Sequence, residues 1–232
     1  SGNPDTTHRF HRDTDGTITV TRTQGVRQET RTYSYDSANT TYRIQTPSSI
    51  ETVTNIEDAD TQTLTVVRTL SDHDGVLASK VEEVYETFPW GRELVRRTMD
   101  PDGDAEQTAY TYENDSASKA HAKLVSVIYP DGYWEKYEYN SWGMRNKIYR
   151  PWKDGPGSPD LADDSNSRTT KDFYSSRGRF YKTEERLLGN LLSESSFGRE
   201  SITVDGQPAI RTTTTNRLSD GTETTSTSTR YQ

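Results

Sequence analysis

Hydrophobic and polar residues alternate one by one along much of this chain. In the segments LVSVIY (124–129) and YWEKYEY (133–139), every second residue falls on the same side of an extended backbone. In the second segment, Tyr137 and Tyr139 therefore lie on one side and Trp134 lies on the other. A period of two residues is typical of β-strands, so the pattern predicts strands throughout the chain.

Asp-Gly pairs separate the alternating segments. The pair occurs seven times, and two of the copies follow a proline, as Pro101-Asp102-Gly103 and Pro130-Asp131-Gly132. Proline presets φ for the first turn position, and glycine takes a positive φ without strain. We therefore predict hairpin turns at these sites, with Asp102, Gly103, Asp131 and Gly132 as the turn residues.

The chain also repeats itself. When it is shifted by 52 residues, six positions in residues 84–103 match residues 136–155, namely Tyr85/Tyr137, Glu86/Glu138, Trp90/Trp142, Gly91/Gly143, Asp102/Asp154 and Gly103/Gly155. Looser copies occur in TYSYDSANTTYRI (32–44), where Asn39 stands at the glycine position, and in DFYSSRGRFYKT (172–183). The repeat predicts the following structural positions: Tyr85, Trp90, Gly91, Tyr110, Tyr112, Tyr137, Tyr139, Trp142, Gly143 and Gly178.

The stretch YTYEND…KLVSVIYPDGYWEKYEYNSWGMRNKIYRP resembles the YD-repeat, or Rhs-repeat, family. The family pattern runs Tyr-x-Tyr-Asp-x-x-Gly-Arg-Leu, followed by a strand and Pro-Asp-Gly. Residues 83–151 match it best, although Glu113 and Asn140 replace the name-giving Asp and Met144 stands in place of Arg. The resemblance implies long antiparallel strands wound into a spiral sheet, which forms a hollow shell or barrel in bacterial Rhs proteins, insecticidal toxin complexes and teneurins.

One repeat unit of two strands and two turns takes about 26 residues, so the chain has room for about nine units and about 15–18 strands. We predict a single all-β domain over residues 1–232, in which antiparallel hairpin units form a continuous, spiral or open-barrel sheet. Residues 153–167 read as a loop insertion, and residues 168–232 as degenerate repeats. Within these, residues 184–196 carry Gly189-Asn190 and predict a hairpin.

Composition indicates a thin core. Only 28% of the residues are hydrophobic, the mean hydropathy is -1.02, and the chain contains 35 threonines. A net charge of -8 argues against a nucleic-acid partner, which needs clustered Lys and Arg. No apolar run is long enough for insertion into a membrane. The chain has no cysteine, which excludes disulfides and thiolate chemistry.

The aromatic residues allow two interpretations. Rings at repeated positions are typical of cross-strand packing, in which opposed aromatic pairs stabilise a sheet. Trp134 and Trp152 lie outside the repeated positions, so we expect them to be exposed and regard them as candidate ligand-binding residues for glycans.

Candidate chemistry is sparse. Asp100, Asp102 and Asp104 have the carboxylate spacing of some calcium loops, but no acidic residue follows at the position that completes an EF-hand, and a turn accounts for them. The chain has no nucleophile elbow and no phosphate-binding glycine loop. We therefore expect no enzyme activity, no metal and no cofactor.

The resemblance suggests a function. We expect a structural scaffold or shell segment of a large bacterial surface or secreted protein. Its partners would be copies of itself, or the remainder of a longer chain, paired through open sheet edges. Two alternatives stay open at this point: a carbohydrate-binding or adhesion module, and the wall of a toxin-encapsulating shell. The chain starts without Met, so we also expect it to be a mature or excised piece of something longer.

Overall fold

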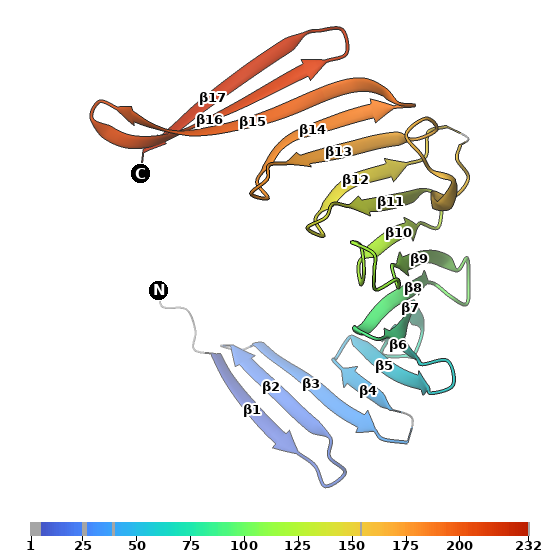
Figure 1. The fold of residues 1–232 in the computed structure, drawn as a ribbon. Helices are drawn as coiled ribbons and strands as arrows, with labels where there is room; N and C mark the ends of the chain where they lie inside the picture. The colour runs from blue at the N-terminus through green and yellow to red at the C-terminus, as the bar shows by residue number, and fades with distance from the viewer. Residues whose placement is uncertain (1–5, 25–26, 39, 154, 232) are drawn as a thin grey trace. The chain divides into compact units, whose positions relative to one another are not determined.

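A computed structural model describes residues 6–24, 27–38, 40–153 and 155–231, without the side chain of residue 27. The described residues form 17 β-strands, and backbone pairing joins them into one antiparallel sheet (Figure 1). This confirms the predicted all-β class, whereas a spiral or barrel shape stays a prediction. The contacts divide the chain into two compact units, Ser1–Ala109 and Tyr110–Gln232.

The first unit is a meander in which each strand pairs with the next. Its strands are β1 (Thr6–Arg12), β2 (Ile18–Gln24), β3 (Arg27–Asp36), β4 (Thr41–Gln45), β5 (Ser49–Asp58), β6 (Thr63–Asp72), β7 (Leu77–Phe88) and β8 (Gly91–Met99), followed by the start of β9 (Glu106–Tyr112). Val66 and Thr98 are the buried residues of its described part. Such a thin core fits the low hydrophobic content.

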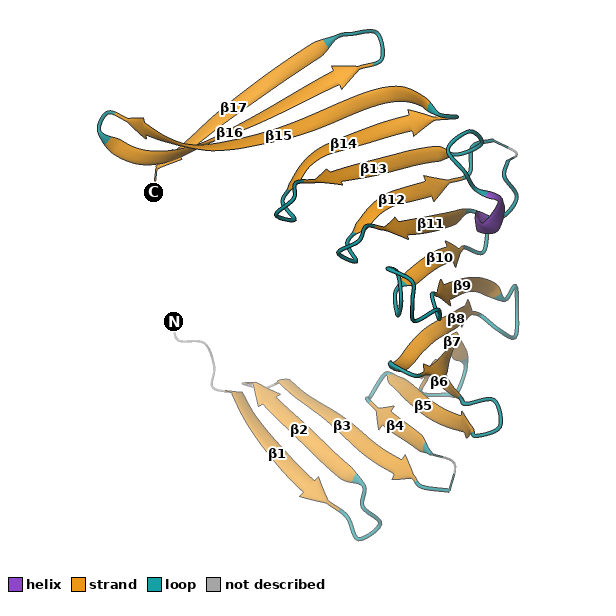
Figure 2. Cartoon of the chain, in the orientation of Figure 1, coloured by secondary structure: helices purple, strands orange, loops and turns teal. Residues whose placement is uncertain are grey.

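The second unit continues the same pattern. Its strands are β10 (Leu124–Ile128), β11 (Trp134–Tyr139), β12 (Arg145–Arg150), β13 (Arg168–Tyr174), β14 (Phe180–Leu187), β15 (Asn190–Val204), β16 (Gln207–Leu218) and β17 (Glu223–Tyr231). A short 3-10 helix, η1 (Pro159–Leu161), lies in the connection between β12 and β13 and is purple in Figure 2. This connection contains the predicted loop insertion.

The two Pro-Asp-Gly turns differ. Gly132 has a φ of 80°, and its N–H donates to the carbonyl of Tyr129 at 3.0 Å, as expected for a tight turn. At the other turn, Gly103 is not in the left-handed region. Asp100 and Ala105 take positive φ values of 48° and 51° instead. The amides of Gly103 and Ala105 both donate to the Asp100 carbonyl at 3.0 Å. This turn is therefore wider, and its two strained residues, Asp100 and Ala105, lie at its ends.

The hairpin predicted for residues 184–196 is confirmed, because β14 and β15 pair through a turn at Leu188-Gly189. The second strand is longer than expected, since β15 runs for 15 residues. Asn39 and Asp154, which the repeat comparison used, lie outside the described residues.

The second unit has one small apolar cluster on each face of its sheet. Val127, Tyr137 and Ile148 form the first cluster. Trp134 and Tyr149 form the second cluster with Ala162 of the β12–β13 connection. Trp134 and Tyr137 are three positions apart on one strand, so their side chains point to opposite faces. Aromatic side chains are therefore buried on both faces of this sheet.

Candidate functional site: repeat contacts and terminal strands

A Glu-x-Tyr segment opposite an arginine is the contact that recurs in both units. In the first unit, the Tyr85 hydroxyl donates to Glu83 Oε2 at 3.2 Å. Glu83 also faces Arg97 of β8 directly in the strand register, with 3.9 Å between Oε1 and the arginine Nε. Arg68 of β6 lies on the other side, 3.5 Å from the same carboxylate. One carboxylate thus links three neighbouring strands.

The second unit holds a tighter copy of this contact. The Tyr137 hydroxyl donates to Glu135 Oε2 at 2.6 Å, and Arg150 Nε of β12 donates to Glu135 Oε1 at 2.8 Å. Arg150 also donates to the Thr170 hydroxyl of β13 at 2.8 Å, and that hydroxyl donates to Glu185 of β14 at 2.7 Å. A chain of polar contacts therefore crosses β11, β12, β13 and β14.

Burial and hydrogen-bond partners shift the pKa values of Tyr137 and Glu135 in this copy. Burial raises the pKa of the Tyr137 hydroxyl well above its ordinary value, and the adjacent Glu135 carboxylate raises it further. Burial by itself would raise the pKa of Glu135. The hydrogen bonds from Tyr137 and Arg150 outweigh that effect and hold the pKa of the carboxyl below its ordinary value. Glu135 is therefore charged and Tyr137 neutral at physiological pH, which suits a stable contact rather than proton transfer.

The sequence comparison had missed the acidic partner. Glu83 and Glu135 are themselves related by the 52-residue shift, one position before the compared window begins. Extending the comparison would have found the pair. The arginines could not be found in this way, because Arg97 and Arg150 are 53 positions apart in numbering. The strand register, including the bulges at Val84/Tyr85 and at Glu138/Tyr139, decides which arginine faces the carboxylate.

The other repeated rings have unequal surroundings. Tyr110 and Tyr139 pack against the Val127 cluster, and the Tyr139 hydroxyl donates to the Leu124 carbonyl at 2.7 Å. Trp90 stacks on Phe88 with 4.7 Å between ring centroids. The remaining repeat positions are half-buried Tyr112, exposed Trp142, and Gly91, Gly143 and Gly178, whose φ values are 145°, 71° and 73°. Trp142 is 53% exposed, so the two repeated tryptophans do not share one packing role.

Trp134 corrects an expectation from the sequence. It is 1% exposed, and its Nε1 donates to the Pro156 carbonyl at 3.0 Å. The β12–β13 connection folds back over it, which no local pattern reveals. The expectation that Trp134 is exposed is therefore wrong, whereas Trp152 is 38% exposed.

The acidic turn residues also have protein partners. Asp102 accepts a hydrogen bond from Lys80 Nζ at 2.8 Å. Asp100 and Asp104 flank the same wide turn. Across the described ranges, no group of three or more His, Cys, Asp or Glu residues is arranged to hold a metal ion.

The two terminal strands each present an edge. β1 pairs with β2, and β17 pairs with β16. Within its own unit, neither strand has a partner among the described residues along its other edge. All seven residues of β1 and all nine of β17 are exposed. Unpaired N–H and C=O groups on such an edge are a template for another strand.

Comparisons with solved structures find matching chains, whereas comparisons with family models and with curated proteins find none. A solved structure of the Tc holotoxin pore of Photorhabdus luminescens aligns over 98% of this chain at 10% sequence identity, with a TM-score of 0.34. This chain spans 15% of that one. Within the described segments, no helix has the length and apolar character needed to cross a membrane.

Proposed function

We propose that this chain is a scaffold segment of a large bacterial surface or secreted protein, and that its sheet continues by strand pairing at β1 and β17. The proposal places the function in the sheet itself. Backbone hydrogen bonds pair the strands, and contacts among carboxylate, arginine and tyrosine side chains link neighbouring strands at intervals along the sheet. The family resemblance in residues 83–151 supports the bacterial surface or secreted setting.

The observation that carries the proposal is that β1 and β17 are wholly exposed and that each pairs with one strand among the described residues of its own unit. Natural sheets commonly protect such edges with lysine, proline or a bulge. β17 reads ETTSTSTRY, with neither lysine nor proline, and its nine residues pair with β16 in an unbroken register. An edge of this length and regularity suits addition of another strand.

Sedimentation and negative-stain electron microscopy of the purified chain test the proposal. We expect assemblies that grow with protein concentration. Replacing Thr225 and Thr227 with Lys adds charge to the edge strand and should reduce assembly. Ser79→Lys is the control for each single change, because it adds the same charge as Thr225→Lys or Thr227→Lys alone, at an exposed residue of β7, which has paired strands on both sides.

Two results would contradict the proposal. In the first, the purified chain stays monomeric at high concentration, and the β17 amides of the protein isolated from its natural source also exchange rapidly with solvent. The other is assembly that Ser79→Lys reduces as much as the Thr225 and Thr227 changes do, because assembly would then depend on net charge and not on the edge.

A further inference from the structure

The second unit contains an unpaired strand edge that does not belong to a terminal strand. β15 pairs with β14 only along residues 190–196, whereas its pairing with β16 continues to Val204. Among the described residues of this unit, residues 197–204 therefore have a partner strand on one side only. Figure 1 shows β15, β16 and β17 continuing past the turn that joins β13 to β14. Residues 197–204 are called the β15 overhang below.

The hairpin of β13 and β14 closes one end of the β15 overhang. The Ser175 amide donates to the Arg179 carbonyl at 2.8 Å, and the Gly178 amide donates to the Ser175 carbonyl at 2.9 Å, so the hairpin turn is tight. Phe180, the first residue of β14, packs on Phe197 with 5.2 Å between ring centroids. A strand that pairs with the overhang would meet this hairpin, so the space suits a segment that itself turns away there.

The backbone of the β15 overhang presents free hydrogen-bonding groups. β15 and β16 are joined by a two-residue turn at 205–206, in which both φ values are positive. Val204 and Gln207 close this turn, so the N–H and C=O groups of Val204 point toward β16. Because these groups alternate along a strand, those of Ser201 and Thr203 point toward the open edge. Ser201 and Thr203 are both exposed, so this edge is accessible to another strand.

Two exposed charges of opposite sign lie along the overhang. Arg199 and Asp205 are an even number of residues apart, so both side chains lie on the same face. In the described parts of the chain, neither of them forms an ion pair. Six residues of extended chain separate them by about 20 Å, so they cannot reach each other within one molecule. Each of these charges is therefore available to a partner chain.

Two copies of the overhang are complementary to each other. Identical edges pair antiparallel about a two-fold axis perpendicular to the sheet, which keeps each face continuous, so one residue of each strand faces its own counterpart. With the axis at Ile202, Ser201 faces Thr203, and these two residues exchange both backbone hydrogen bonds. Arg199 of each copy then faces Asp205 of the other copy. Both the backbone groups and the opposite charges find partners in this register.

Other positions of the axis fit less well. An axis at Glu200 would bring two carboxylates face to face, which destabilises a strand pair. An axis at Ser201 would set Asp205 against Phe197, on the side where Phe180 already packs. The charges and the hairpin wall therefore select Ile202 as the centre of the pair.

We propose that two copies of this chain form a two-fold dimer in which their β15 overhangs pair about Ile202. The turn at 205–206 of each copy then lies against the end of the β13–β14 hairpin of the other copy. Symmetry closes this interface after two copies, whereas pairing at β1 and β17 adds further copies to a sheet. The dimer uses a different edge, so it stands with or without sheet growth at the terminal strands.

Single cysteines test the position of the axis, because the chain has no cysteine of its own. Each is placed in a background chain that carries Thr225→Lys and Thr227→Lys, which adds charge to the β17 edge and opposes sheet growth. Under mild oxidation, Ile202→Cys should form a disulfide-linked dimer, because this residue faces its own counterpart. Two Glu200→Cys residues would lie about 14 Å apart along the paired strands, beyond the reach of a disulfide.

A mixture of two variants checks the same register. Glu200 faces Val204 of the other copy when the axis lies at Ile202. Chains with Glu200→Cys should therefore cross-link to chains with Val204→Cys, although Glu200→Cys alone should link at least about tenfold more slowly than Ile202→Cys.

Sedimentation velocity of the background chain measures the dimer without any cross-link. Asp205→Asn removes one charge and keeps a residue that tolerates positive φ before glycine, so the turn is preserved. Arg199→Gln removes the other charge from an exposed position. Each change should raise the dissociation constant of the dimer about fivefold, because each removes the ion pair at both ends of the interface. Thr212→Gln is the control, since Thr212 is exposed on β16 between two paired strands, and it should leave the constant unchanged.

Three results would overturn the proposal: a background chain that stays monomeric up to millimolar concentration, Glu200→Cys chains that link as fast as Ile202→Cys chains, or a dissociation constant that neither Asp205→Asn nor Arg199→Gln changes. Circular dichroism should show every variant folded. Should Ile202→Cys fail to fold, sedimentation of the two charge variants decides alone. Filament growth by the unmodified chain is scored separately by electron microscopy, so loss of sheet growth and loss of the β15 dimer are distinguishable.

Discussion

Replacing Tyr137 with Phe removes one hydroxyl group and leaves the packed ring in place. The hydroxyl donates to Glu135 at 2.6 Å, and Tyr137 is only 8% exposed. A hydrogen bond to a charged group contributes about 1.5–3 kcal/mol to stability. Glu135 keeps its bond from Arg150 in the variant, so the carboxylate is not left without a partner. We therefore expect a loss near the lower end of this range, about 1.5 kcal/mol.

Tyr85→Phe is the matched control, since Tyr85 occupies the related position of the preceding repeat. Its bond to Glu83 is longer, at 3.2 Å, and Glu83 shares its charge with Arg68 and Arg97. The contribution of this hydroxyl should be smaller, about 0.5 kcal/mol, in the range of partly exposed polar contacts. The two variants differ from the parent by the same single oxygen atom.

Urea unfolding followed by tryptophan fluorescence measures the difference. With a slope of about 2 kcal/mol per molar urea, the midpoint should fall by about 0.7 M for Tyr137→Phe and by about 0.2 M for Tyr85→Phe. If the two units unfold separately, the Tyr137 effect belongs to the transition in which buried Trp134 becomes solvated. Equal shifts in the two variants, or no shift for Tyr137→Phe, would refute the reasoning that a short, buried contact to a carboxylate stabilises the repeat.

Three further outcomes follow from other residues. Trp134→Ala should lower the free energy of unfolding by about 3–5 kcal/mol, because it leaves a cavity at a covered site, whereas Trp152→Ala should lower it by less than about 1 kcal/mol. Thermal unfolding of both variants compares the two losses of stability, and similar losses would contradict the burial of Trp134. Gly132→Ala should cost about 1 kcal/mol from its φ of 80° alone, since no atom lies within 4 Å of an added Cβ; an unchanged melting temperature would argue against this turn geometry. Burial acts to raise the pKa of Glu184, but hydrogen bonds from Lys182 and Arg186 hold the pKa below its ordinary value. The Glu184 carboxylate therefore stabilises the fold fully at pH values above its ordinary pKa, and this contribution is lost as the pH falls through its lower pKa in the folded state. The difference in melting temperature between the parent and Glu184→Gln should therefore become smaller in acid. A difference that grows in acid would contradict this argument.

Local features of the sequence account for most of the fold. Alternation around Tyr137, the Asp131-Gly132 turn and the hairpin at Leu188-Gly189 each depend on residues close together in the chain, so they can be recognised without coordinates. The repeat also related Tyr85 to Tyr137, and both tyrosines donate to the glutamate two residues before them. Side-chain period and backbone φ preference are short-range properties, which is why these predictions succeed.

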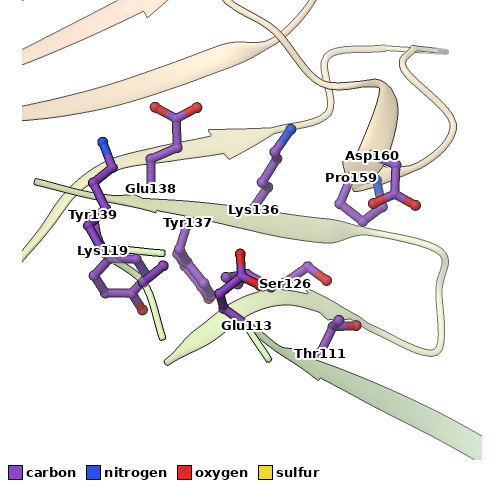
Figure 3. A pocket seen from close by; sticks show the side chains of 12 residues that line it. Thr111, Glu113, Lys119, Ser126, Lys136, Tyr137, Glu138, Tyr139, Pro159 and Asp160 are labelled. Atoms are coloured by element: carbon purple, nitrogen blue, oxygen red, sulfur yellow. The ribbon is translucent and has the colours of Figure 1, made fainter. Parts of the chain in front are cut away.

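The tertiary structure alone decided which side chains are covered and which meet. Trp134 is buried because a connection that starts 17 residues later folds back over it, while Trp142 in a nearby turn stays exposed. The partner of Glu135 depends on strand register, and a single bulge changes that register by one residue. The connections formed by residues 113–123 and 151–167 line one depression over β10 and β11 (Figure 3) for the same reason. Contacts between residues far apart in sequence depend on how the whole sheet is paired, and no local pattern encodes that information.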